Sequence, residues 1–283
     1  MDLQAALNAC EATVRQSDPD RYFASLFAPE ERRPLLFVLY AFNHELARIG
    51  ETVKEPMVAA IRLQWWREAL ASARDLHHRG HDVVHGLVDV FARVGPPLEL
   101  FEAMIDARES DAADVTFADM ESLEAYADAT SGNLMRLAAR VLGAGEERET
   151  LHDAHARAAG IAYALTGILR AIPFHAAHGK LFLPRDVLAD EGVTPEDVLV
   201  HHRGGRLKPV IARIAARARV HLDASRLMER PGPALAAFLP AAIAPLYLKQ
   251  MEQPGFDVFH DAVAPALFRR QWGLLRGVWR GRL

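Results

Sequence analysis

Apolar positions repeat at helical spacing along nearly the whole chain. In residues 163–169, for example, Leu165, Ile168 and Leu169 fall on one face, before Pro173 interrupts the pattern. No run alternates Val, Ile or Thr with polar residues between turn signals, so strands are not expected. The pattern predicts an all-α fold of about ten helices, over residues 29–51, 55–75, 81–95, 96–114, 120–143, 147–172, 194–202, 207–230, 234–253 and 265–282.

Two segments, residues 35–42 and 161–169, are apolar on nearly every side and belong in the centre of a bundle. Gly160 and Gly167 allow a close neighbour or a cavity there, and Ser131 and Gly132 interrupt another helix. The longest apolar run, residues 234–248, contains two prolines and is shorter than the roughly 20 residues that span a bilayer. We therefore expect a single domain over residues 1–283 and no membrane-spanning helix.

Charge is unevenly distributed, although the net charge is only -4. Residues 1–200 contain 19 Lys and Arg against 32 Asp and Glu, whereas residues 201–283 contain 14 against 5. The basic C-terminal part could face an anionic membrane, a protein or a nucleic acid, or simply pack near the acidic part. The single cysteine, Cys10, excludes internal disulfides and multi-thiolate zinc sites, and a reducing compartment is expected.

Motifs of the common enzyme classes are mostly absent. The chain contains neither a dinucleotide-binding glycine loop nor a P-loop, and the segment HELAR at residues 44–48 lacks the second histidine of a zinc protease. Histidines at positions 77, 78, 81 and 85 could ligate a metal, but Gly80 among them favours a polar loop. The N-terminus also lacks the long apolar region of a signal peptide.

An acidic segment between Asp106 and Asp128 contains eight carboxylates. Carboxylates four residues apart on a helix can share one hard cation. In this segment only Glu124 and Asp128 have that spacing, and no apolar helix frames the others. We interpret the segment as a solvated face and loop rather than a metal site.

Four segments resemble successive blocks of the squalene/phytoene synthase family. They are RRPLLFVLYAFNHELARIGE, RLQWWREAL, SLEAYADATSGNLMRLAARVLG and GIAYALTGILRAIPFHAAHGKLFLPRDVLADEGV, and the resemblance extends over roughly residues 18–250. The resemblance implies an isoprenoid synthase-type helical bundle around a central cavity. It also implies two facing DxxxD motifs whose aspartates hold magnesium against substrate diphosphates, so that diphosphate can leave.

The resemblance places those motifs at residues 47–51 and 171–175, where the aspartate positions are Ala47, Glu51, Ala171 and His175. Of the four, only Glu51 suits magnesium, because neutral histidine is a poor ligand for a hard cation. We therefore expect no prenyl transfer, no catalytic residues and no metal or cofactor. We expect Arg170 to form a structural ion pair, for example with Glu51, or else to bind an anion. The implied relict cavity comprises Asn43, His44, Ala47, Glu51, Arg170, Ala171, Phe174 and His175.

A branch of that family, the complex I assembly factor 6 proteins, shares the same departures. The resemblance lies in AFNHELA at residues 41–47, LRAIPFH at 169–175, FLP at 182–184 and FDVFH at 256–260. It implies a non-enzymatic assembly factor whose partner is a complex I subunit or assembly intermediate. Without a transit peptide, a bacterial protein peripheral on the cytoplasmic face of the inner membrane is expected. Two alternatives are a head-to-head prenyl diphosphate transferase, which would use magnesium, and a prenyl-lipid binding protein.

The basic C-terminal helix, expected at about residues 262–283, is the best candidate for a contact surface. Basic and aromatic side chains alternate there, as in helices that lie on anionic membranes. The alternative is that its tryptophans belong to the core of a last packed helix. Nucleic-acid binding is not expected, because no supporting fold motif is present. The residues proposed for membrane or partner contact are Arg269, Arg270, Trp272, Arg276 and Trp279.

Overall fold

The structure, a computed structural model, describes residues 2–53, 55–112, 117–143, 149–200 and 202–283. These residues form an all-α bundle without strands, as the apolar pattern predicts. The first half contains α1 (Leu3–Ser17), α2 (Pro19–Ser25), α3 (Arg33–Thr52), α4 (Pro56–Arg74), α5 (Asp82–Val94), α6 (Leu98–Ala112), α7 (Met120–Ala127) and α8 (Asn133–Val141). The second half contains α9 (Glu149–Arg170), α10 (Ile172–Ala177), α11 (Arg185–Asp190), α12 (Pro195–Leu199), α13 (Gly204–Leu227), α14 (Leu235–Ala242), α15 (Ala244–Met251) and α16 (Leu267–Arg280).

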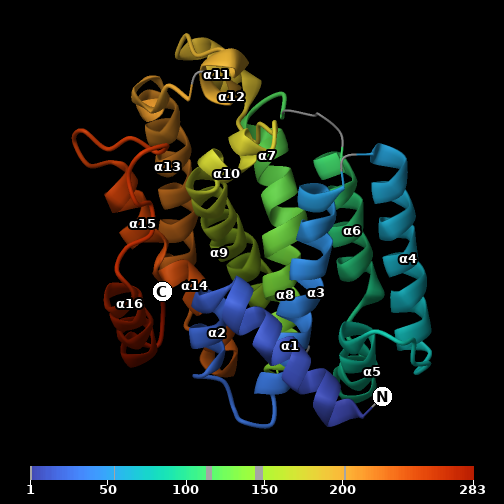
Figure 1. Cartoon of the computed structure of the whole chain (residues 1–283). Coiled ribbons are helices and arrows are strands. Elements are labelled where there is room, and N and C mark those ends of the chain that lie inside the picture. Colours follow the sequence, from blue (N-terminus) through green and yellow to red (C-terminus); the bar gives the residue numbers. More distant parts are fainter. Residues whose placement is uncertain (1, 54, 113–116, 144–148, 201) are drawn as a thin grey trace.

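The centre of the bundle is formed by the helices that are apolar on most sides. Helices α3, α8 and α9 stand side by side there, with α4, α5 and α6 on one flank and α13 to α16 on the other (Figure 1). Residues 35–42 of α3 are all buried, as the sequence predicts. The short helices α10, α11 and α12 gather at one end of the bundle, beside the carboxyl end of α9 (Figure 1).

Two helix interruptions shape the middle of the molecule. Helix α9 ends at Arg170, and Pro173 lies in the first turn of α10, where its missing N–H costs no hydrogen bond. Between α7 and α8, residues Asp128–Gly132 form a π-helix, which accounts for the interruption at Ser131 and Gly132. Gly160 lies against this turn, and a Cβ there would meet the Gly132 Cα at 2.5 Å. The backbones of α9 and the π-helix can therefore approach closely.

Several sequence expectations need correction. Helices α1, α2, α10 and α11 were not expected; α1 and α2 begin at side-chain caps from Asp2 and Asp18. The basic C-terminal helix is Leu267–Arg280, shorter than the expected 262–283.

The longest apolar run, residues 234–248, lies inside a longer apolar segment. In the described part of the chain, Gly232–Met251 has the length and mean hydropathy to span a membrane. However, 67% of its most apolar window is buried inside the bundle, and a buried core helix passes the same test.

Candidate functional site

A cavity of about 270 Å³ opens between α3, α9 and α10. Its walls combine residues from the region between α1 and α2, the carboxyl ends of α6 and α9, the α7–α8 turn and the loop after α10. The lining residues are Asp18, Arg21, Asn43, Ala47, Gly50, Glu51, Arg108, Asp111, Tyr126, Thr130, Ser131, Tyr163, Ala164, Gly167, Ile168, Arg170, Ala171, Phe174, His175, His178, Lys180 and Phe182.

The residues expected in the relict cavity come together here, with one exception. Asn43, Ala47 and Glu51 face the cavity from α3 because they are spaced four residues apart along one helix. Arg170, Ala171, Phe174 and His175 face it from the end of α9 and from α10, and they are 119 or more residues away in sequence from Glu51. His44 does not line the cavity. One residue along a helix turns the side chain by about 100°, which carries His44 off the face shared by Asn43 and Ala47.

The donor set around the cavity does not fit magnesium. Of the four positions from which the family's carboxylates would act, Glu51 alone supplies a carboxylate. In the described ranges, no group of three or more His, Cys, Asp or Glu side chains could hold a metal ion. Arg108 and Arg170 also face the cavity, and the carboxylates with which they pair, Asp111 and Asp20, are not free to ligate a metal ion.

His175 is held neutral by its surroundings. Burial, together with the nearby Arg108, His178 and Lys180, lowers its pKa to about 4. Its ring lies against Phe182, with 4.4 Å between ring centroids. Its Nδ1 atom is buried and has no hydrogen-bond partner in the described residues. The imidazole at this position therefore packs as a flat, uncharged wall of the cavity.

A buried polar network that the sequence analysis missed forms another wall. Asp111 accepts hydrogen bonds from Arg108 (2.8 Å) and from the Tyr126 hydroxyl (2.8 Å), and Lys180 donates to its backbone carbonyl. Asp111 is buried, so the interpretation of residues 106–128 as a solvated face is wrong for this residue. Asp114, another carboxylate of that segment, lies outside the described residues. The signal in the sequence was Arg108, the one basic residue in the acidic segment, placed three residues before Asp111.

Arg170 forms an ion pair, but with Asp20 rather than Glu51. Its guanidinium lies 3.5 Å from the Asp20 carboxylate and 5.0 Å from the centroid of the Tyr247 ring. The Tyr247 hydroxyl donates to the same carboxylate at 2.6 Å. Arg270 of α16 completes the cluster at 2.6 Å from Asp20. The expectation of Arg270 as a surface contact is therefore wrong, because its side chain is only 16% exposed and is used inside the fold.

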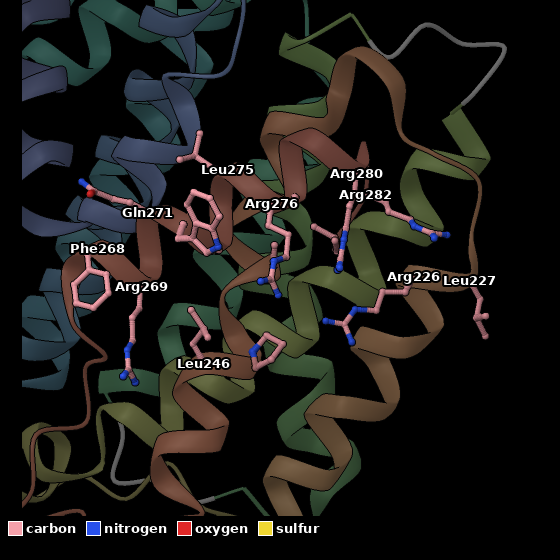
Figure 2. Close-up of a pocket in the computed structure, with 16 residues that line it drawn as sticks. Arg226, Leu227, Leu246, Phe268, Arg269, Gln271, Leu275, Arg276, Arg280 and Arg282 are labelled. Atoms are coloured by element: carbon pink, nitrogen blue, oxygen red, sulfur yellow. The ribbon is translucent and has the colours of Figure 1, made fainter.

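The other C-terminal candidates do lie at the surface. Trp272 and Trp279 are 62% and 88% exposed, which excludes the alternative that they are core residues. Arg269, Trp272 and Arg276 border a wide groove of about 1020 Å³ between α16 and helices α13 to α15 (Figure 2).

The histidine-rich segment between α4 and α5 is the expected loop. His81 caps α5 by accepting a hydrogen bond from the Val83 N–H (3.2 Å), and the rings of His78 and His85 lie 4.2 Å apart. Burial, with the nearby His78, lowers the pKa of His85.

Comparison of the sequence with known proteins shows the family. The sequence profile of the squalene/phytoene synthase family matches residues 14–272. A mouse protein named NADH dehydrogenase (ubiquinone) complex I, assembly factor 6, is 31% identical, over 96% of this chain and 82% of its own length. A presqualene diphosphate synthase from Rhodopseudomonas palustris is 30% identical, over 74% of each chain.

Solved structures support the same fold. A dehydrosqualene synthase crystallised with a ligand superposes with a TM-score of 0.82 at 18% identity, covering 98% of this chain and 97% of its own. The fold is therefore the all-α isoprenoid synthase fold. The chain belongs to the squalene/phytoene synthase family, and its relatives include proteins named as complex I assembly factors as well as synthases.

Proposed function

We propose that this chain is a catalytically degenerate member of its family and acts without catalysis as an assembly factor for respiratory complex I. The observation that carries the proposal is the donor set of the central cavity. Both segments that would hold magnesium face this cavity, yet Glu51 is the one carboxylate among their four ligand positions. Loss of one electrostatic catalytic group costs on the order of 100-fold in rate, so loss of three should abolish prenyl transfer.

The size of the cavity supports the same proposal. Pockets that enclose drug-sized ligands have volumes of roughly 300–1,000 Å³. The central cavity, at about 270 Å³, falls below that range, and side chains such as Phe174, His175 and Phe182 occupy its walls. Two prenyl chains joined head to head need a much larger apolar space. A transferase is therefore disfavoured, and a carrier of one prenyl lipid would need the cavity to widen.

The relatives named assembly factor 6 supply the positive part of the proposal, because they match nearly the whole chain at about 30% identity. On this basis the partner is a complex I subunit or assembly intermediate. We further propose that the chain acts at the membrane that holds complex I, bound peripherally.

The test is deletion of the gene in a bacterium that carries both this chain and complex I. We expect a fall in assembled complex I on native gels and in NADH:ubiquinone oxidoreductase activity of membranes. Glu51→Gln removes the last carboxylate at the four ligand positions and should restore complex I as well as the unchanged chain does. Unchanged complex I in the deletion strain would overturn the assembly role.

A second measurement addresses catalysis directly. The purified chain is incubated with farnesyl diphosphate, with and without magnesium, and the products are extracted and analysed. We expect no condensed product. A magnesium-dependent product that Glu51→Gln abolishes would establish the transferase instead. Binding of the prenyl chain without a product would indicate a lipid carrier.

A further inference from the structure

Helix α16 is fixed to the bundle by one narrow face. Leu274 and Gly277 on this face are buried, and Arg270 is tied to Asp20. A Cβ at Gly273 would lie 2.9 Å from the Ile243 side chain, and one at Gly277 would lie 2.9 Å from Leu239. These four positions recur at intervals of three and four residues, so they form a single stripe. The glycines let α16 lie close against α14 and α15, which fixes the direction of every other side chain.

The rest of α16 presents large apolar side chains to solvent. Phe268, Trp272 and Trp279 are 67%, 62% and 88% exposed, and Leu275 is also exposed. Tryptophan has an apolar body and a polar N–H, and it is enriched where protein meets the membrane–water interface. Large apolar side chains gain no free energy while they stay exposed to water. This surface is therefore suited to contact with an apolar phase or an apolar partner.

The groove beside these aromatics has a basic rim and an apolar floor. Pro245 and Leu246 line it from α15, and Figure 2 shows Arg226 of α13 and Arg276 of α16 extending into the same opening. No Asp or Glu side chain is among the lining residues that the structure describes. Arg226 has an ion pair with Asp223 (3.1 Å), whereas the other arginines of the rim form no ion pair within the described residues. The rim arginines are Arg226, Arg269, Arg276, Arg280 and Arg282.

We propose that this groove and the outer face of α16 are a docking surface for a bilayer of anionic phospholipid, with lipid phosphates on the arginines and the tryptophans at the depth of the headgroups. Charge complementarity favours this occupant, because guanidinium groups bind phosphate through paired hydrogen bonds. The surrounding sequence has the same bias, with 14 basic against 5 acidic residues in 201–283. The inference goes beyond the assembly role, since it holds whatever protein the chain helps to assemble.

The test uses the full chain and sedimented vesicles of phosphatidylcholine, with or without about one third phosphatidylglycerol. We expect binding to the anionic vesicles only, weakening as salt is raised. One basic residue near such a surface contributes a factor of about five in affinity. Arg276→Gln with Arg280→Gln should therefore weaken binding about 30-fold. A matched control is Arg48→Gln with Arg62→Gln, which removes the same charge from exposed positions on α3 and α4 and should leave binding unchanged.

Fluorescence locates the contact. Vesicles should shift the tryptophan emission to shorter wavelength. Trp272→Phe with Trp279→Phe should remove the shift, since Trp66 is buried and Trp65 is partly buried against the same core. Circular dichroism of each variant verifies folding.

No binding of the unchanged chain to anionic vesicles would overturn the proposal. Protection of the groove by a purified complex I subunit would then show that the groove binds a protein partner. Equal loss in the control pair would overturn the assignment to this groove. Vesicle binding by a chain that does not restore complex I would refute the assembly role alone.

Discussion

Replacing Asp20 with asparagine should destabilise the fold more than replacing a charged residue at the surface does. The Asp20 side chain is 3% exposed and is contacted from three directions. Arg270 reaches it from α16 at 2.6 Å, Arg170 from α9 at 3.5 Å, and the Tyr247 hydroxyl from α15 at 2.6 Å. One carboxylate on α2 therefore joins three helices that are distant in sequence. It also connects the wall of the central cavity, through Arg170, with the helix that carries the exposed tryptophans.

The expected cost follows from the buried charge that remains. Removing one partner of a buried ion pair costs about 3–5 kcal/mol, because the other charge is left without compensation. Here the stranded group is Arg270, whose side chain is 16% exposed. A typical unfolding free energy is about 5–15 kcal/mol, so the loss is a large fraction of the total. At about 2.1 cal/mol/K of unfolding entropy per residue, the midpoint of thermal unfolding of this 283-residue chain should fall by about 5–8 °C.

Urea unfolding followed by circular dichroism measures this effect. The matched control is Asp190→Asn, which removes a carboxylate that lies 2.8 Å from Arg213 but is 62% exposed. Exposed pairs contribute about 0–1 kcal/mol, so the control should change stability little. If Asp20→Asn cost less than about 1 kcal/mol, the cluster would not act as a buried ion pair, and the reasoning about α16 anchoring would be refuted.

Two further predictions concern His175 in the cavity wall and the glycines of α9. Because the pKa of His175 is about 4 in the folded chain and about 6.5 in the unfolded one, the unfolded chain takes up the proton first; stability should fall as pH drops from 6.5 to 4, by up to about 3 kcal/mol. His175→Phe should remove that part of the slope in urea titrations at several pH values, and an unchanged slope would contradict the assignment. Gly160→Ala should destabilise by about 1–3 kcal/mol, because its Cβ would meet the Gly132 backbone, whereas Gly167→Ala, with nothing within 4 Å, should stabilise by about 0.5–1 kcal/mol. Thermal unfolding compares the two variants, and equal shifts would show that α9 does not press on the π-helix.

Helical periodicity was enough to predict much of the fold, whereas the candidate site came from the resemblance to the synthase family. That resemblance implied a relict cavity with Ala47 and Glu51, and Asn43 shares their face one turn earlier; in the structure all three line a cavity. Pro173 and the interruption at Gly132 were visible as breaks, and both are helix ends or irregular turns. Such features are local, because they depend on residues within one or two turns of each other.

The ion pairs could not be predicted in the same way. Arg270 and Asp20 are 250 residues apart, and no periodicity within either helix identifies the partner of the other. In the sequence, Asp111 is one member of an acidic run that suggests a solvated face. In the structure it accepts a hydrogen bond from the Tyr126 hydroxyl of another helix. A charged residue is buried only when its partner comes with it. The prediction therefore needs the tertiary fold that the sequence pattern alone does not provide.

The pairing of these charges also bears on what the cavity can do. A site that binds diphosphate through metal ions must present carboxylates to the metal ions. Its arginine and lysine side chains must stay unpaired so that they can bind the substrate. In this cavity the arrangement is the reverse. Arg21 lies 2.8 Å from Asp18 and Arg108 lies 2.8 Å from Asp111, so carboxylates of the chain already neutralise the guanidinium groups. An incoming diphosphate would have to displace these carboxylates, and breaking the buried Arg108–Asp111 pair alone would cost several kcal/mol. The charge balance thus favours a cavity that stabilises the bundle over one that binds a substrate.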